Sequence, residues 1–124
     1  MEKDEVFKDE IELIADFSFG NRVAAVFDDM LDRSVPYYQE IQRMISEMAV
    51  DFAVEATNVY DLGCSTGTTL ISLHQCLPRD VKLIGVDNSE AMLEKCRKKL
   101  KSEVDSGNFE LICMDLNQGI HVEN

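Results

Sequence analysis

The sequence predicts an α/β fold in which helices alternate with parallel strands, preceded by a helical segment. The first observation is a change of pattern: residues 21–52 carry apolar side chains at helical spacing, whereas short apolar runs appear after residue 57. The second is that these runs alternate with further helical stripes. The third is a glycine-containing loop directly after the first run. Strands that alternate with helices form parallel sheets with right-handed crossovers.

The 124-residue chain divides into three segments. Residues 1–16 are rich in acidic side chains and are interpreted as an N-terminal arm. Residues 17–55 form the helical segment, and residues 56–124 form the α/β part. Hydrophobic side chains make up 45% of the chain, which is enough for one domain with a core of its own.

The helical segment contains two amphipathic patterns separated by Pro36. Proline disfavours helical geometry in the residue before it but suits the first turn of a new helix. The first apolar stripe consists of Val23, Val26, Phe27, Met30 and Leu31. The second consists of Tyr38, Ile41, Ile45, Met48 and Phe52.

The α/β part reads as strand, helix, strand, helix, strand. Strands are predicted over 58–62, 81–86 and 109–114, and a helix over 66–77. The second crossover helix follows Ser89, which is a suitable N-cap. Because the strands are continuous apolar runs, we expect helices to cover both faces of the sheet.

Composition argues against several classes of function. The net charge is −12, so direct binding of a nucleic acid is not expected. The basic cluster between Lys95 and Lys101 is interpreted as the solvated face of a helix. No apolar run approaches the roughly 18 residues that span a membrane, and the acidic start differs from a secretory signal, so a cytoplasmic protein is expected. The four cysteines contain no CxxC pair, and no metal site is predicted.

The loop at residues 63–67 is the most informative segment. Ligands of open α/β sheets bind at the carboxyl ends of strands, where glycine lets the backbone turn sharply and approach a ligand. Gly63 and Gly67 alone are equally compatible with a structural turn. Asp87 favours a ligand, because it ends the second strand twenty residues after Gly67, where a carboxylate can accept both ribose hydroxyls. The alternative for Asp87 is a capping role near Ser89.

Two further positions are candidates for the same site. Asp115 closes the third strand and could accept a hydrogen bond from the exocyclic amine of an adenine, with Leu116 packing near the ring. Loop acids are also common turn formers, so this alternative stays open. Tyr38 lies on an apolar stripe, and the residues alone leave open whether it is part of the core or reaches a ligand.

These features resemble the class I S-adenosylmethionine-dependent methyltransferases. Their first motif is an acid followed by a glycine-rich loop, which here reads Asp61-x-Gly63-x-Ser65-x-Gly67, with Ser65 where a middle glycine is common. The resemblance implies a Rossmann-like fold, of which this sequence contains the first three strands.

A closer resemblance, to the carboxy-S-adenosyl-L-methionine synthases, runs from about Phe17 to the last residue. The Arg-Ser-Val-Pro segment is its most specific feature, because methyltransferases in general do not share it. The segments that carry the resemblance are Phe17-Ser18-Phe19, Arg22-Val23-Ala24-x-Val26-Phe27-x-Asp29-Met30, Arg33-Ser34-Val35-Pro36-x-Tyr38, Val59-Tyr60-Asp61-Leu62-Gly63-Cys64-Ser65 and Asp87-Asn88-Ser89-x-Ala91-Met92.

This resemblance implies a reaction and a set of ligand contacts. The family converts S-adenosylmethionine and prephenate into carboxy-S-adenosylmethionine and phenylpyruvate, in preparation for wobble-uridine modification of tRNA. In the proposed route, an ylide formed at the sulfonium methyl group captures carbon dioxide from prephenate. The implied ligand is S-adenosylmethionine or its carboxylated form. Its implied contacts are Tyr38, then Gly63, Cys64 and Ser65 at the amino-acid end, Asp87 and Asn88 at the ribose, and Asp115 and Leu116 at the adenine.

The resemblance also implies what this stretch of chain does not contain. The family's fourth strand and the segments after it supply further contacts, including an arginine that reads the added carboxylate, so the 124 residues alone are expected to be inactive. The first strand is central in the complete sheet, and its exposed edge here is expected to pair with another chain, which favours a homodimer. No catalytic residue is named, because the chemistry relies largely on the substrate.

Two alternatives remain at this stage. One is an ordinary S-adenosylmethionine-dependent methyltransferase of the same fold. The other is an inactive fragment that only binds a nucleoside or pairs with another chain.

Overall fold

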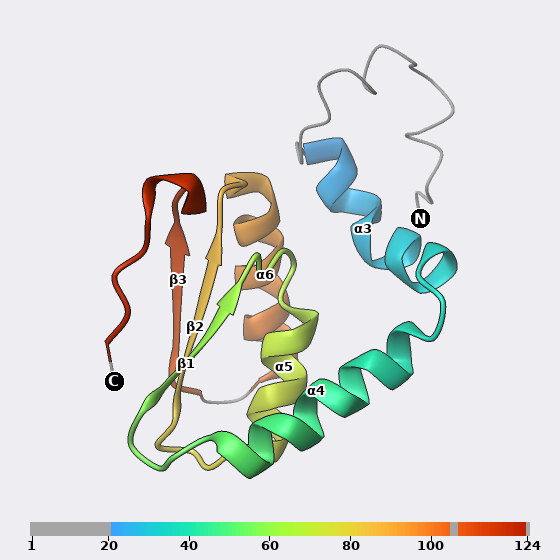
Figure 1. Cartoon of the computed structure of the whole chain (residues 1–124). Coiled ribbons are helices and arrows are strands. Elements are labelled where there is room, and N and C mark those ends of the chain that lie inside the picture. The colour runs from blue at the N-terminus through green and yellow to red at the C-terminus, as the bar shows by residue number, and fades with distance from the viewer. Residues whose placement is uncertain (1–20, 105–106, 124) are drawn as a thin grey trace.

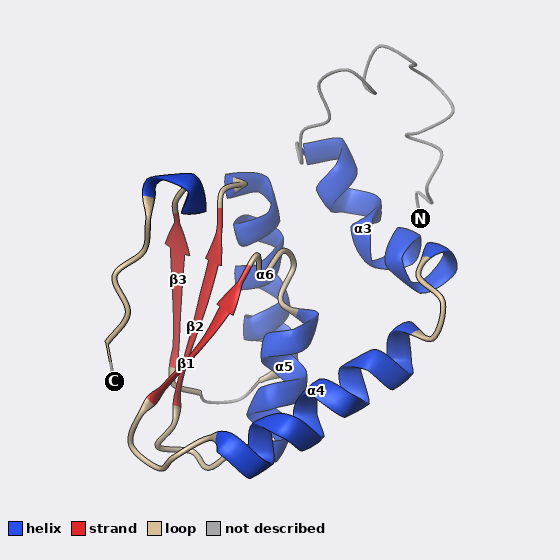
Figure 2. Cartoon of the chain, viewed as in Figure 1, coloured by secondary structure: helices blue, strands red, loops and turns tan. Residues whose placement is uncertain are grey.

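The computed structural model describes residues 21–104 and 107–123 (Figures 1 and 2). The predicted acidic arm, residues 1–16, lies outside the described residues. The α/β class with parallel strands is confirmed. In chain order the elements are α3 (Asn21–Ser34), α4 (Tyr38–Phe52), β1 (Asn58–Leu62), α5 (Thr68–Cys76), β2 (Lys82–Asp87), α6 (Glu90–Glu103), β3 (Phe109–Cys113) and the short 3-10 helix η1 (Leu116–Gln118).

The three strands form one parallel sheet in the order β1-β2-β3. Both crossover helices, α5 and α6, lie on the same face of this sheet (Figure 1), as two right-handed crossovers that step in one direction require. The expectation that helices cover both faces is therefore wrong for the described part of the chain. β2 is almost wholly buried as the central strand, whereas β1 and β3 are only partly buried.

A single apolar core joins the sheet to α5 and α6. Each fully buried aliphatic side chain in such a core contributes roughly 1.5–3 kcal/mol relative to exposure. The β1–α5 loop is anchored to this core, because Cys64 of the loop is one of the buried core residues. The other buried members are Leu70, Leu73, Leu77, Val81, Leu83, Leu93 and Cys96.

The two N-terminal helices pack outside this core, α3 against α6 and α4 against α5. Val26 and Phe27 of α3 are buried against Met92 of α6. This contact lies at the N-terminal end of α6, so α3 lies beside the carboxyl edge of the sheet.

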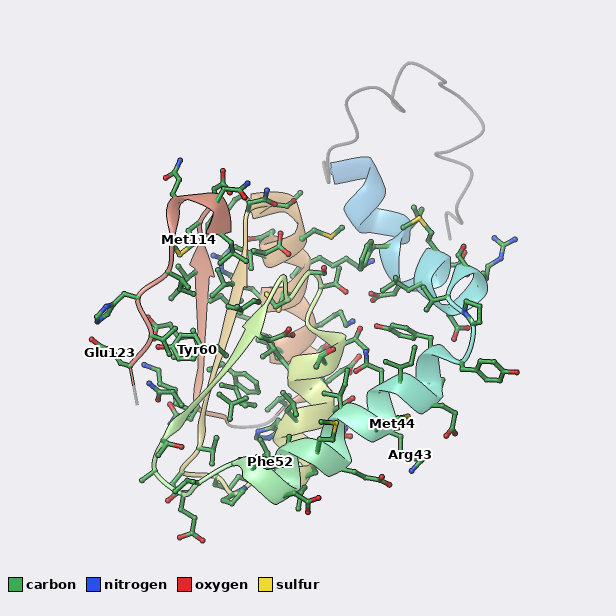
Figure 3. All side chains as sticks on the ribbon, viewed as in Figure 1. Arg43, Met44, Phe52, Tyr60, Met114 and Glu123 are labelled. Atoms are coloured by element: carbon green, nitrogen blue, oxygen red, sulfur yellow. The ribbon has the colours of Figure 1, made fainter. Side chains whose placement is uncertain are left out.

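The apolar stripe predicted for α4 does not form its packing face. Ile41, Met48 and Phe52 are 42%, 60% and 79% exposed (Figure 3 labels Phe52). The side of α4 that packs on α5 instead carries Gln42, which is buried, and Ala49, which packs against the core. The sequence pattern therefore identified the helix correctly but not its buried face.

The segment after η1 contacts the face of the sheet opposite to α5 and α6 (Figures 1 and 3). Val59 packs in the core, so the neighbouring Tyr60 points to the other face. There the backbone N–H of Glu123 donates to the Tyr60 hydroxyl at 3.0 Å, and the Asn58 side chain donates to the Glu123 carbonyl at 3.0 Å. The segment therefore lies against β1, the strand at one edge of the sheet.

Candidate functional site

The loop between β1 and α5 turns through three residues with positive φ: Gly63 at 82°, Ser65 at 54° and Gly67 at 91°. This left-handed region favours glycine and is otherwise adopted mainly by short polar residues. The helix predicted from Thr66 begins instead at Thr68, because Gly67 has left-handed geometry and serves as the N-cap.

The loop is fixed to the end of β2 by its own backbone. The N–H groups of Gly63 and Cys64 both donate to the Val86 carbonyl, at 2.7 and 2.9 Å. The Cys64 side chain points into the core, where a hydrogen bond with Cys96 and burial raise the pKa of its thiol. Cys64 therefore presents its backbone, and not a reactive thiolate, to the site.

Asp87 connects this loop to the next helix. One carboxylate oxygen accepts the Ser65 N–H at 3.0 Å, and the other accepts the Ser89 N–H at 2.9 Å. Ser89 in turn caps α6 by accepting the Met92 N–H at 3.2 Å, as predicted. The capping alternative for Asp87 is thus realised, yet each carboxylate oxygen retains a second lone pair for a ligand.

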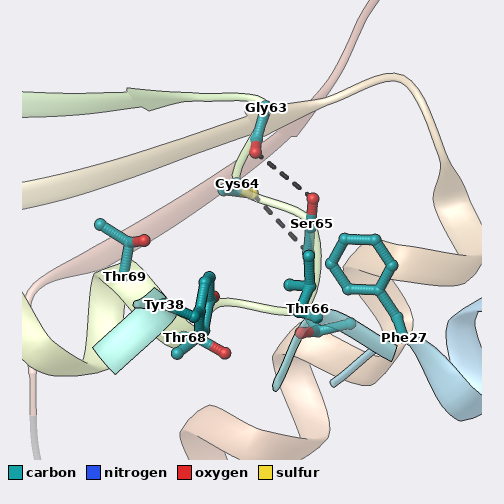
Figure 4. Close-up of a pocket in the computed structure, with 9 residues that line it drawn as sticks. Phe27, Tyr38, Gly63, Cys64, Ser65, Thr66, Thr68 and Thr69 are labelled. Atoms are coloured by element: carbon teal, nitrogen blue, oxygen red, sulfur yellow. Dashed lines mark hydrogen bonds between the residues drawn. The ribbon is translucent and has the colours of Figure 1, made fainter. Parts of the chain in front are cut away.

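Two cavities open at the carboxyl edge of the sheet, and Gly63 lines both. The first, of about 220 Å³, lies between the loop and the N-terminal helices (Figure 4) and is lined by Phe27, Leu31, Tyr38, Gly63, Cys64, Ser65, Thr66, Thr68 and Thr69. The second, of about 230 Å³, lies over the ends of β2 and β3 and is lined by Gly63, Asp87, Asn88, Met114, Asp115, Leu116 and Asn117. All eight predicted contact residues line one cavity or the other; their contacts with a ligand remain predictions.

The second cavity is lined by carboxylate and amide side chains together with apolar ones. Asp115 accepts the Asn117 N–H at 2.9 Å and begins η1, so the turn-forming alternative is realised while the residue also lines the cavity. Leu116 beside it is 39% exposed and offers an apolar surface. Carboxylate and amide groups next to an apolar side chain suit a ligand with hydroxyls and a flat ring.

Tyr38 lies in the wall of the first cavity and not in the core. Burial raises the pKa of its phenol, with the nearby charges of Asp28 and Asp61 acting in the same direction, while hydrogen bonds to Thr68 and Gln42 oppose the rise. The hydroxyl is therefore protonated at neutral pH and available as a hydrogen-bond donor.

Five residues that line the first cavity are not among the predicted contacts. Phe27 and Leu31 belong to an apolar stripe, which by itself indicates only helix packing. Thr66, Thr68 and Thr69 follow the glycine loop directly, and their position at a helix start on the ligand edge could have identified them.

The acids at the ends of β1 and β2 give this region a negative charge. Burial and the neighbouring charge of Asp87 raise the pKa of Asp61. Two carboxyl groups held close together favour a positively charged ligand group nearby.

Within residues 21–104 and 107–123, no three His, Cys, Asp or Glu side chains gather as a metal site would require. No helix in these ranges has the length and apolar character needed to cross a membrane.

Comparisons with known proteins agree with this arrangement. The sequence pattern of a family described as "Methyltransferase domain" matches residues 59–124. A carboxy-S-adenosyl-L-methionine synthase from Methylococcus capsulatus is 55% identical over the whole chain, which covers 52% of that protein. One from Shewanella sp. (strain ANA-3) is 45% identical over 98% of the chain and 50% of its own length. The resemblance inferred from the motifs is confirmed, and the chain spans about half the length of the curated relatives it matches.

Solved structures show the same fold. A Methanococcus maripaludis protein assigned to the S-adenosyl-L-methionine-dependent methyltransferases superimposes with a TM-score of 0.64 at 19% identity, over 80% of this chain and 43% of that one. The magnesium protoporphyrin IX methyltransferase of Synechocystis, solved with bound SAH, gives a TM-score of 0.56 at 26% identity, over 65% of this chain and 36% of that one.

Proposed function

The chain belongs to the methyltransferase-domain family, and on this premise we propose that it is part of a carboxy-S-adenosyl-L-methionine synthase. The proposed reaction converts S-adenosylmethionine and prephenate into carboxy-S-adenosylmethionine, phenylpyruvate and water. A carboxyl group moves from prephenate to the sulfonium methyl carbon. The proton lost from that methyl group and the hydroxide lost from prephenate together form the water.

The observation that carries the proposal is the convergence of eight predicted residues on two cavities that share Gly63. They come from the start of α4, the β1–α5 loop and the ends of β2 and β3, which are far apart in the sequence. A ligand that spans both cavities would pass over Gly63, where no side chain blocks the way.

In this proposal the second cavity holds the adenosine part of the ligand. Asp87 accepts hydrogen bonds from the ribose hydroxyls through its remaining lone pairs, assisted by Asn88. Asp115 accepts from the exocyclic amine of the adenine, and Leu116 packs on the ring. These roles are supported by the acceptors and the apolar surface that the cavity presents.

The first cavity would hold the amino-acid end and the sulfonium centre. Backbone N–H groups at the start of α5 can bind a carboxylate, and the Tyr38 hydroxyl can donate to the ligand. The negative charge of Asp61 and Asp87 favours the sulfonium cation. The arginine implied for the added carboxylate would come from the half of the protein that follows these strands.

We further propose that the protein acts as a cytoplasmic homodimer. Support for the dimer comes from the apolar side chains exposed on α4, among them Met44, which is 54% exposed, and Met48, which is 60% exposed. An exposed apolar helix face of this kind is a usual site of protein association. Sedimentation of the full-length protein as a concentration-independent monomer would contradict this part of the proposal.

The test is calorimetric titration of the full-length protein with S-adenosylmethionine and with its carboxylated form, followed by a turnover assay with prephenate. We expect micromolar or tighter binding, preference for the carboxylated form, and release of phenylpyruvate that requires both substrates. Asp87→Ala is expected to weaken binding at least roughly tenfold, because two charge-assisted hydrogen bonds to the ribose are lost. Asp80→Ala, which removes an exposed acid from a turn, is the matched control.

An ordinary methyltransferase is the second candidate, favoured by the family match and by the solved relatives. The same assay separates the two. Formation of S-adenosylhomocysteine with a methyl acceptor, without consumption of prephenate, would establish the second candidate and refute the first.

A further inference from the structure

A charged cluster beside the first cavity joins three parts of the fold through side chains that the ligand assignment does not use. Lys99 of α6 donates to Asp28 of α3 at 2.8 Å and to the Thr68 hydroxyl at 3.0 Å. The Thr66 hydroxyl donates to the other oxygen of Asp28, and Lys99 lies 3.5 Å from that hydroxyl. The cluster therefore links α3, the β1–α5 loop with the start of α5, and α6.

The cluster is shielded from water more than a typical surface ion pair. The Lys99 side chain is 19% exposed and that of Asp28 is 36% exposed, while Thr66 is 1% exposed. Burial acts to raise the pKa of Asp28, but the hydrogen bonds from Lys99 and Thr66 outweigh it and leave that pKa below its ordinary value. Exposed ion pairs contribute little, whereas shielded and hydrogen-bonded ones contribute more.

Lys99 departs from the pattern of its own helix. Its neighbour Lys98 is exposed to solvent, as expected for a basic cluster on a solvated helix face. Lys99 instead reaches across to α3. A lysine held between a carboxylate and two hydroxyls has a defined position, which a solvated lysine does not.

The position of Asp28 relates the cluster to the ligand. Two consecutive loop residues are held by carboxylates: the Ser65 N–H by Asp87, and the Thr66 hydroxyl by Asp28. Phe27, adjacent to Asp28 in the chain, lines the first cavity together with Thr66. Asp28 therefore fixes the distance between the β1–α5 loop and α3, which form opposite walls of the first cavity.

We propose that Asp28 and Lys99 are positioning residues for the ligand, forming an ion-pair latch that holds α3 against the β1–α5 loop and so shapes the first cavity. The latch rests on the proposed function, because it concerns the same ligand site. Lys99 neutralises Asp28 and contacts the loop hydroxyls, and neither residue is assigned a contact with the ligand. Apolar packing of α3 on α6 keeps the helix docked when the latch is broken, but leaves its distance from the loop less well fixed.

The test compares Lys99→Met with Lys98→Met in the full-length protein. Both changes remove one lysine charge from α6, but only the first breaks the latch. We expect Lys99→Met to weaken S-adenosylmethionine binding roughly five- to a hundredfold, the usual range for coupling between an element and a site. Lys98→Met should leave the dissociation constant unchanged.

Two further variants test the mechanism. Lys99→Arg keeps the charge and the donors and should restore most of the affinity. Asp28→Asn should also weaken binding. The double variant Asp28→Asn with Lys99→Met should weaken binding no more than the stronger of the two single variants, because all three variants break the same latch. Since Asp28→Asn removes no side-chain volume, it keeps the proposal testable if Lys99→Met fails to fold.

Hydrogen exchange separates positioning from simple stability and does not depend on activity. Faster exchange of α3 and of residues 63–68 in Lys99→Met than in Lys98→Met, at equal global stability, supports the latch. A lower melting temperature with unchanged affinity and unchanged exchange in these segments would overturn it. If the unmodified protein binds neither form of the ligand, the proposed function fails. The hydrogen-exchange rates of α3 and of residues 63–68 in the two variants then decide for or against the latch.

Discussion

Gly67 ends the ligand loop at a point where the backbone leaves no room for a side chain. Its φ is 91°, and a Cβ built on it would lie 2.5 Å from the Sγ of Cys96, which is fully buried. Gly63 in the same loop has a similar φ of 82°, yet a Cβ there would meet nothing within 4 Å. Alanine substitutions at the two glycines therefore separate two costs. Backbone strain applies at both positions, whereas steric overlap applies only at Gly67.

We expect Gly67→Ala to destabilise the protein by about 2–5 kcal/mol and Gly63→Ala by only about 1–2 kcal/mol. A left-handed conformation costs an L-residue roughly 1–2 kcal/mol, and this applies to both changes. Overpacking in a rigid core adds roughly 1–3 kcal/mol, and this applies only at Gly67, because the core around Cys96 is closely packed.

Urea unfolding of the full-length protein, monitored by circular dichroism, measures both differences. Combining Gly67→Ala with Cys96→Ala should recover most of the overlap energy, since the atom that the new Cβ would meet is removed. Two results would refute this reasoning. One is that Gly67→Ala lowers the free energy of unfolding no more than Gly63→Ala does. The other is that the double variant loses as much free energy of unfolding as the sum of the losses of Gly67→Ala and Cys96→Ala.

Three further predictions concern single side chains. Asp87→Asn should lower the free energy of unfolding by roughly 1–3 kcal/mol, because the new amide NH2 must face one of the two backbone N–H groups that donate to the carboxylate. In the same urea titration, Asp80→Asn at an exposed turn should have no such effect. Asp61→Asn should stabilise the protein at pH 7, because burial and then the charge of Asp87 raise the pKa of Asp61 and so penalise its ionised form. This penalty is present above the raised pKa and is lost as the pH falls through it, so the gain should shrink on acidification; a gain that grows in acid would contradict the assignment. Tyr60→Phe should accelerate hydrogen exchange at Glu123, whose N–H loses its acceptor, while costing at most about 1 kcal/mol of stability, because the contact is exposed; unchanged exchange would show that the contact does not order this segment.

Much of the candidate site could be predicted because its signals are local. A short apolar run, a glycine loop and a helical stripe each involve neighbouring residues, and parallel strands bring their carboxyl ends to one edge. Asp87 and Asp115 follow different strands, so their approach to Gly63 follows from topology alone. The structure confirms that geometry, since Gly63 and both acids line the cavity over the ends of β2 and β3.

The N-terminal helices show where this reasoning fails. The apolar stripe of α4 predicted its buried face wrongly, because the buried position is filled by Gln42, whose side chain accepts the Thr69 hydroxyl at 3.0 Å. A buried amide is stable only when it has such a partner, and the partner lies on another helix. The same holds for Lys99, which the sequence placed on a solvated face.

The sequence by itself determined the order of the elements, the parallel sheet and the residues that gather at its carboxyl edge. These depend on hydrophobic periodicity, on glycine conformation and on the handedness of crossovers, which are properties of short stretches of chain. Only the tertiary structure decided which face of α4 is buried, and that Asp28 and Lys99 meet beside the loop. Those outcomes depend on pairs of side chains that are far apart in the sequence, and their interaction free energies exist only once the chain has folded.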